Sequence, residues 1–216
     1  YLEHGQVEHV IDCFEQMKRE GKYQDEVTYI CCLKACGLIG TSMKGLQVHC
    51  DVIKKGLDRR LVVSNTLIDM YTKCGVLQKA HKVLQDLPVR NVVTWNALIA
   101  GYVQQGQWHE ALNCFDQMQV KGYYPSAATF ASVLHLYGVL GASQKGEELH
   151  IQIEKDSFYI NDIVVGNALV DMYSKCDAIE RARDMFIIRD TVSWNALISG
   201  YAKSGHDEET LNCFQH

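Results

Sequence analysis

The sequence has 216 residues, of which 47% are hydrophobic, with a formal net charge of -5, nine cysteines and two prolines. This composition is typical of a folded protein, and the odd number of cysteines argues against a disulfide framework. No apolar run reaches the roughly 18 residues of a membrane span. The acidic charge argues only weakly against a nucleic-acid partner, because net charge does not report how charges are distributed.

Three kinds of repeat follow one another along the chain. The opening segment YLEHGQVEHVIDCFEQMK is the second half of a standard repeat that recurs as NVVTWNALIAGYVQQGQWHEALNCFDQMQ and DTVSWNALISGYAKSGHDEETLNCFQ. A long repeat begins at Glu26 and again at Ala127, and a short repeat begins at Leu61 and again at Ile163. The predicted repeats are therefore residues 1–25, 26–60, 61–91, 92–126, 127–162, 163–190 and 191–216.

Each complete repeat is predicted to form two helices joined by a turn. In the central standard repeat, a first apolar stripe with helical spacing consists of Trp95, Leu98, Ile99 and Tyr102. Gly106 ends that pattern, and a second stripe consists of Ala111, Leu112, Phe115 and Met118. One hairpin cannot bury its apolar face alone, so the repeats must stack. The sequence therefore predicts an all-α solenoid of helix-turn-helix repeats.

The cysteines recur at fixed places in the repeats. Cys13, Cys114 and Cys213 share one position, and Cys74 and Cys176 share another. This pattern favours small core side chains over metal or redox chemistry. The recurring aromatic residues are also expected in the core or between repeats, and they are Trp95, Trp194, Tyr71, Tyr102, Tyr173 and Tyr201.

The second short repeat, 163–190, has 28 residues where its sister has 31. Three residues are missing after Phe186, where the sister sequence reads QDLPVRN. Either the protein has a deletion in the last turn of that second helix, or residues are absent from the given sequence.

The segments WNALIAGY, SWNALISGY, MYTKCG and MYSKC resemble the pentatricopeptide repeat family over the whole chain. The alternation of standard, long and short repeats further resembles the plant PLS class of that family. The resemblance implies a right-handed superhelix that binds single-stranded RNA at one base per repeat. It also implies an RNA-editing factor of mitochondria or chloroplasts, whose targeting peptide and any deaminase domain would lie outside this sequence.

In the family, the fifth residue of a repeat and its last residue jointly face one base. The resemblance assigns the fifth positions to Asn65, Asn96, Asn167 and Asn195, and the last positions to Asn91, Ser126 and Asp190. The family's pairing rule then predicts C or U, C, and U for the three complete pairs, and a pyrimidine for Asn195. The expected RNA core is 5′-(C/U)-C-N-U-(C/U)-3′, bound parallel to the protein chain.

Two further positions complete the predicted interface. The second residues, which would stack on the bases, are Val62, Val93, Val164 and Val192. Lys73, Lys175 and Lys203 share position thirteen, where a flexible cation can meet a phosphate. The long repeats depart from this pattern, with Ile30 and Arg60 in one and Ala131 and Asp162 in the other. They are expected to act as spacers or as docking surfaces for accessory editing proteins.

Other interpretations stay open from the sequence alone. The asparagines near helix starts can serve as helix caps, although Thr94 and Ser193 are better placed for that task. The lysines can be solvated surface residues. Tetratricopeptide-like solenoids use similar hairpins to bind proteins, and a basic or an acidic inner wall would discriminate the two functions.

No catalytic site, metal site or cofactor is predicted. His206 and Glu208 match half of a zinc deaminase motif, but no P-C-x-x-C segment follows them. His49 and His150 recur in the long repeats, yet the second copy has no neighbouring ligand. The chain is therefore expected to bind and not to catalyse.

Overall fold

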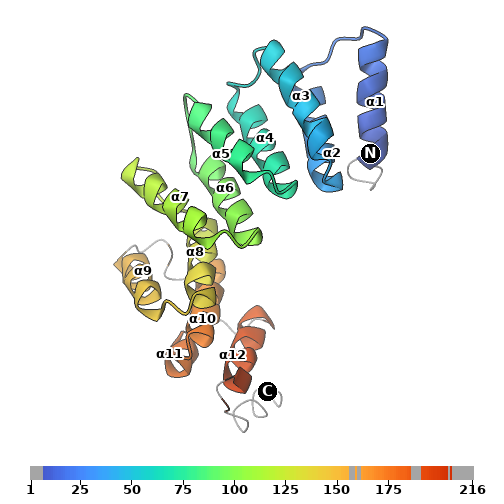
Figure 1. The fold of residues 1–216 in the computed structure, drawn as a ribbon. Helices are drawn as coiled ribbons and strands as arrows, with labels where there is room; N and C mark the ends of the chain where they lie inside the picture. The colour runs from blue at the N-terminus through green and yellow to red at the C-terminus, as the bar shows by residue number, and fades with distance from the viewer. Residues whose placement is uncertain (1–6, 156–158, 160–161, 186–190, 204, 206–216) are drawn as a thin grey trace. The chain divides into compact units, whose positions relative to one another are not determined.

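The computed structural model of the chain describes residues 7–155, 159, 162–185, 191–203 and 205. Within these residues it contains twelve α-helices and no β-strand (Figure 1). The helices are α1 (Val7–Arg19), α2 (Glu26–Ile39), α3 (Ser42–Lys54), α4 (Leu61–Lys73), α5 (Leu77–Asp86), α6 (Val92–Gln104), α7 (Trp108–Val120), α8 (Ala127–Val139), α9 (Ser143–Lys155), α10 (Ile163–Lys175), α11 (Ile179–Asp184) and α12 (Thr191–Lys203). The predicted all-α fold is confirmed.

The helices alternate between two kinds. The A helices, α2, α4, α6, α8, α10 and α12, each begin at the first residue of a predicted repeat. The B helices, α1, α3, α5, α7, α9 and α11, lie in the second half of a repeat. Turns with a left-handed residue separate the two, as at Gly75 with a φ of 72°. In the sister repeat Asp177 takes a φ of 60°, a conformation that Asp tolerates better than most side chains.

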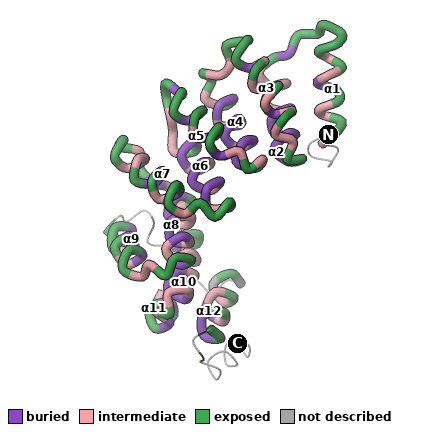
Figure 2. Tube along the Cα trace, in the orientation of Figure 1, coloured by how far each residue is buried: buried purple, intermediate pink, exposed green. Residues whose placement is uncertain are grey.

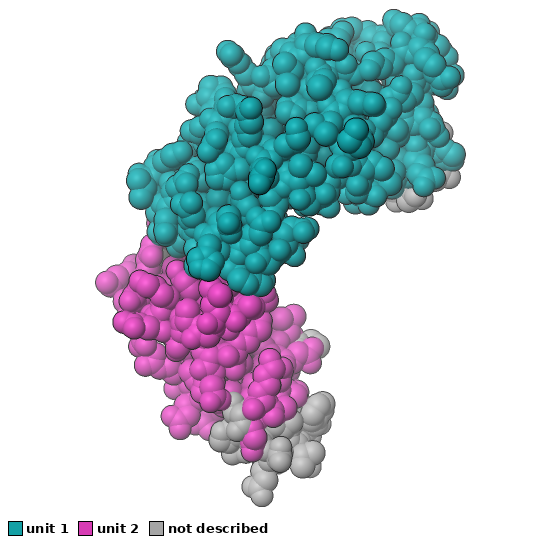
Figure 3. Space-filling view, in the orientation of Figure 1, with its two compact units in different colours: residues 1–123 teal, residues 124–216 magenta. Residues whose placement is uncertain are grey.

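The chain divides into two compact halves, residues 1–123 and 124–216 (Figure 3). In the N-terminal half, α2 packs against α4, and α4 packs against α6. The B helix α3 contacts both α2 and α4, and α5 contacts both α4 and α6. The A helices therefore form one continuous layer, and each of these B helices covers the junction between two of them (Figure 1).

The C-terminal half repeats this arrangement. Its A helices α8, α10 and α12 pack in chain order, with α9 against α8 and α10, and α11 against α10 and α12. Each repeat thus buries its apolar stripe against its neighbours, as expected for a stacked array.

The long and short repeats meet through the same close contact in both halves. A Cβ atom on Gly45 of α3 would lie 2.4 Å from Met70 Sδ of α4. A Cβ atom on Gly146 of α9 would lie 2.5 Å from Met172 Sδ of α10. The missing side chain therefore lets the B helix of a long repeat approach the next A helix closely.

A histidine–tyrosine hydrogen bond joins successive repeats. His49 Nδ1 lies 2.7 Å from the Tyr71 hydroxyl, and His150 Nδ1 lies 2.9 Å from the Tyr173 hydroxyl. Burial lowers the pKa of both histidines, and it raises the pKa of Tyr71 to about 12. The histidine and the tyrosine of each pair are thus both neutral, and the tyrosine hydroxyl can donate to the unprotonated Nδ1 of the histidine.

The apolar core lies mainly on the A helices, where buried residues gather in Figure 2. Five of the aromatic residues predicted for the core are buried, namely Trp95, Tyr71, Tyr102, Tyr173 and Tyr201. The sixth, Trp194, is half-buried. In the described part of the chain, no helix has the length and apolar character that crossing a membrane requires.

The prediction for the cysteines is only partly right. Cys114 is buried, and Cys74 and Cys176 are half-buried. Cys13, at the same repeat position as Cys114, is exposed in α1. Cys213 lies outside the described residues.

The histidines predict a loss of stability in mild acid. Their pKa values are lowered in the folded state, so below about pH 6.5 the unfolded chain binds more protons than the folded one. The free energy of unfolding, measured by urea denaturation, should therefore fall between pH 7.5 and 5.5. Replacing both His49 and His150 with Gln should flatten this dependence, while His109→Gln, at an exposed position, should not. A wild-type free energy that stays constant over this range would contradict the account.

Candidate nucleic-acid interface

The last residue of a predicted repeat caps the following A helix. Asn91 Oδ1 accepts a hydrogen bond from the backbone N–H of Thr94 at 2.9 Å, and Ser126 accepts one from Thr129. Asp25 and Asp162 cap α2 and α10 in the same way. The residues assigned to base recognition at last positions therefore also fix where the next helix begins.

Thr94 is not the N-cap of α6, because it is the third helical residue and a cap must precede the first. It takes part in the capping box instead, since its buried hydroxyl accepts the backbone N–H of Asn91 at 3.4 Å. The capping alternative fails for the fifth-position asparagines, because Asn65 and Asn96 lie a full turn inside α4 and α6, but it holds for Asn91. The side chain of Ser193, the other expected cap, is outside the described part of the structure.

A buried hydroxyl brings a fifth residue and a last residue together in the N-terminal half. Thr94 Oγ1 lies 2.7 Å from Asn65 Oδ1 and 2.7 Å from Asn91 Oδ1. The three residues come from α4, the turn before α6, and α6 itself, so the packing of two A helices creates the cluster. Because the Asn65 oxygen accepts from Thr94, its amino group remains as a hydrogen-bond donor.

The remaining fifth and last residues lie as follows. Asn96 is half-buried in α6 of the N-terminal half, and its predicted partner Ser126 is half-buried in the C-terminal half. Asn167 is half-buried in α10, while Asp190 lies outside the described residues. Asn195, in α12, is exposed. The structure therefore brings only the pair Asn65 and Asn91 together within one half.

The predicted stacking residues share an unusual exposure. Val62 and Val93 are 58% and 59% exposed, and Val164 and Val192 are 52% and 60% exposed. Each is the second residue of its A helix. Scattered exposed apolar residues are ordinary on proteins, but here the exposure recurs at one repeat position, where the resemblance predicts a stacking contact.

The first long repeat carries a residue of the same kind that the sequence interpretation missed. Val27 is 63% exposed at the second position of α2. The last residue of this long repeat, Arg60, lies at the N-cap position of α4 but forms no side-chain capping hydrogen bond. The signal was available, because Val27 aligns with Val62 and Val93 once the helix starts are known. Ile30 and Ala131, at the fifth positions of the long repeats, are half-buried.

The lysines are less available than predicted. Lys73 Nζ lies 2.7 Å from Asp69 Oδ2, one turn earlier in α4. Lys175 Nζ lies 2.5 Å from Asp171 Oδ2 in α10 and 3.2 Å from His135 Nδ1. A phosphate would have to share these cations with a carboxylate. Lys203 is exposed at the end of α12.

The described residues give no sign of a metal centre: they contain no group of three or more His, Cys, Asp or Glu residues placed to hold an ion. The recurring long-repeat histidines bond to tyrosines instead. The half-motif at His206 and Glu208 lies outside the described residues.

Comparison with known proteins identifies the repeat. Models of the PPR repeat match residues 1–21, 62–92 and 192–216, and a model of the PPR repeat family matches residues 90–138. Together these matches cover more than half of the chain. The chain belongs to the pentatricopeptide repeat family.

Two pentatricopeptide repeat-containing proteins of Arabidopsis thaliana illustrate the relationship. One, named mitochondrial, is 33% identical over 85% of this chain and 29% of its own length. The other, named chloroplastic, is 33% identical over 81% of this chain and 28% of its own length. The chain thus spans less than a third of the length of these pentatricopeptide repeat relatives.

A solved structure shares the fold. The pentatricopeptide repeat protein PPR10, in a crystal structure with an 18-nt psaJ RNA element, matches 98% of this chain and 32% of its own chain with a TM-score of 0.81. The sequence identity is 20%, so this likeness establishes the fold of the repeat array.

The Thr94 cluster predicts a specific loss of stability. Thr94→Val removes the hydroxyl and leaves the Asn65 oxygen without its donor, while the Asn91 oxygen keeps the backbone N–H of residue 94. The loss should cost about 1 to 3 kcal/mol of unfolding free energy in urea denaturation. Thr28→Val is the matched control. It removes the hydroxyl at the same repeat position in α2, where the neighbouring cap, Asp25, is exposed. Thr94→Val without a larger loss than Thr28→Val would contradict the cluster.

Proposed function

We propose that the chain binds single-stranded RNA and recognises one base with each standard or short repeat. The main support is the Thr94 cluster, which holds the amide of Asn65 beside the amide of Asn91 at the start of an A helix. An exposed valine accompanies it on each side, at Val62 and Val93. Unpaired bases are recognised by this combination of an apolar stacking contact and hydrogen bonds along their edges.

The Asn65 amide is compatible with a pyrimidine. Its oxygen accepts from Thr94, so its amino group remains as a donor. The carbonyl oxygens of C and U accept such a donor, as do acceptor atoms of purines, so the pyrimidine preference rests on the family's pairing rule. The last residue then biases the choice between the two bases, with Ser126 for C and Asp190 for U. The proposed target remains 5′-(C/U)-C-N-U-(C/U)-3′.

The long repeats hold no polar fifth residue, so we assign them no base discrimination. The exposed Val27 supports stacking without sequence preference at the first of them. The second has Ala128 at that position and is the neutral N of the target. Docking of accessory editing proteins on these repeats is part of the same proposal.

The wider biological role is inferred from the repeat pattern. The alternation of standard, long and short repeats supports the target-recognition part of a plant organellar C-to-U editing factor of the PLS class. Relatives named mitochondrial and chloroplastic support an organellar location. The described part of the chain offers binding groups, so the chain itself is assigned a non-catalytic role.

The base assignment predicts how short oligonucleotides bind. Changing the second base of the target from C to A should weaken binding about tenfold, as expected for one lost base contact. Changing the third base, which faces a long repeat, should have little effect. Fluorescence anisotropy with short labelled RNAs measures both. Equal affinity for the C and A targets would contradict base recognition, and absent RNA binding with capture of peptides would favour a protein scaffold.

Ser126→Asp should change the base preference without harming the fold. Asp caps helices as well as Ser does, as Asp162 shows at α10. The preference at the second base should move from C toward U, with a changed ratio of the two dissociation constants. Ser126→Asn is the control, since it keeps a cap without the carboxylate. A ratio that is the same for Asp and Ser would argue against the two-residue rule.

A further inference from the structure

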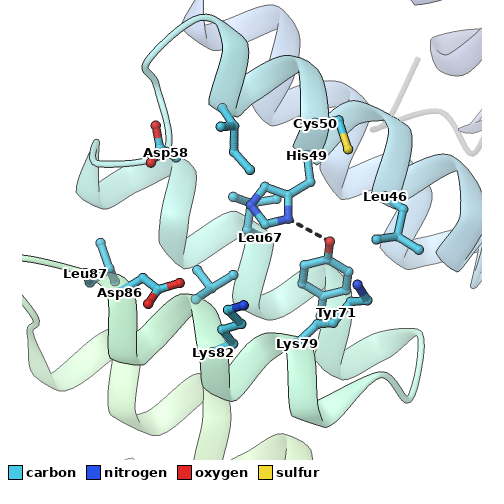
Figure 4. Close-up of a pocket in the computed structure, with 12 residues that line it drawn as sticks. Leu46, His49, Cys50, Asp58, Leu67, Tyr71, Lys79, Lys82, Asp86 and Leu87 are labelled. Atoms are coloured by element: carbon cyan, nitrogen blue, oxygen red, sulfur yellow. Dashed lines mark hydrogen bonds between the residues drawn. The ribbon is translucent and has the colours of Figure 1, made fainter.

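The first long–short junction contains a pocket that takes no part in the proposed RNA interface. It lies between α3 and α5 over α4 and has a volume of about 350 Å³ (Figure 4). Leu46, Ile53, Leu67, Val83 and Leu87 form its apolar lining. Its polar lining comes from His49, Cys50, Asp58, Tyr71, Lys79, Lys82 and Asp86. Pockets of this size and mixed character are typical of small-ligand sites.

Three nitrogen-bearing side chains of the pocket lining, His49, Lys79 and Lys82, have no ion pair with an acidic residue that the structure describes. His49 Nδ1 bonds to Tyr71, which leaves Nε2 without a hydrogen bond to any described residue (Figure 4). Lys79 and Lys82 are exposed, and neither forms an ion pair with a residue that the structure describes. Three nitrogen donors therefore line the pocket without a bond to the two carboxylates, of Asp58 and Asp86, that also line it.

The sister junction in the C-terminal half shows the same scaffold with the acidic groups supplied. There His150 Nδ1 bonds to Tyr173, and His150 Nε2 lies 3.5 Å from Glu154 Oε1. Arg181 lies over the Tyr173 ring and pairs with Glu147 at 2.6 Å. This pocket is smaller, about 220 Å³, and its own side chains satisfy its cation and its histidine.

Four aligned substitutions change the charges of the lining. Glu147 and Glu154 of the second junction correspond to Leu46 and Ile53 of the first, both on the pocket lining. Arg181 corresponds to Lys79, and Asp184 corresponds to Lys82. The first junction has therefore exchanged two carboxylates for apolar side chains while retaining the histidine, the tyrosine and the cation. A ligand that provides a carboxylate together with an apolar body would restore what the second junction provides internally.

We propose that the pocket between α3, α4 and α5 binds a small apolar carboxylate. The carboxylate would accept hydrogen bonds from Lys79, Lys82 and the Nε2–H of His49, and charge-assisted bonds of this kind are the strong ones. The hydrocarbon body would pack on Leu46 and Ile53. Asp58 and Asp86 lie toward the Leu87 end of the pocket, away from Leu46 and Tyr71, and neither is bonded to His49, Lys79 or Lys82 (Figure 4).

Phenylbutyrate is a suitable probe, with phenylbutyramide as its uncharged control. Ligand-observed NMR titration of the chain should give a dissociation constant on the order of 0.1 to 1 mM for the acid, as expected for so few atoms. The amide should bind at least about tenfold more weakly, because it lacks the charge that the lysines complement. Equal binding of acid and amide, or no binding of either, would overturn the proposal.

The sister junction supplies matched variants. Leu46→Glu with Lys79→Arg should give the first pocket the same glutamate–arginine ion pair that the second pocket has, and should abolish binding of the acid. Lys79→Gln, at an exposed position, should weaken binding at least about fivefold and gives an answer if the double variant does not fold. Conversely, Glu147→Leu, Glu154→Ile, Arg181→Lys and Asp184→Lys together should create a second binding site.

The variants also separate this pocket from the RNA interface. Affinity for the target RNA should be unchanged by Lys79→Gln, since the pocket shares no residue with the recognition pairs. Binding of the acid that survives both Lys79→Gln and the double variant would overturn the proposal. Binding of an acidic peptide without any binding of phenylbutyrate would also overturn the proposal.

Discussion

The contact between one A helix and the next is the interaction on which this structure depends. It continues the apolar core from repeat to repeat, because α2, α4 and α6 pack in sequence, as do α8, α10 and α12. The same contact brings Thr94 of α6 against Asn65 of α4, so a hydroxyl of one repeat holds the fifth and last residues of the repeat before it side by side. Stability and the proposed base recognition therefore depend on the same junction, and a change in helix packing would alter both.

The junctions between repeats differ in which apolar side chains they leave exposed and which cations they leave without an ion pair. At the start of the A helices, valines more than half exposed flank polar side chains that cap a helix or bond to a buried threonine. On the B-helix side, two junctions share a glycine contact and a histidine–tyrosine bond, yet only the second pairs its cation with a glutamate. Internal duplication makes these differences informative, because the scaffold around them is the same.

Much of the fold followed from the sequence because a hairpin repeat fixes both the helix spacing and its apolar stripe, as Trp95 and Tyr102 show. The candidate site was harder to predict where side chains of neighbouring helices meet. The capping role of Asn91 in place of Thr94 depends on the first helical residue, which periodicity locates only to within a residue or two. The pairing of Lys73 with Asp69 was visible as a spacing of four, but competing partners cannot be ranked without coordinates.

Selection of bound sequences from a random RNA pool tests the central claim most directly, because it presumes no target. The account predicts enrichment of a short pyrimidine-rich motif with C and U two positions apart and an unconstrained base between them. Recovery of sequences indistinguishable from the starting pool, or of a motif built on purines at those two positions, would contradict it.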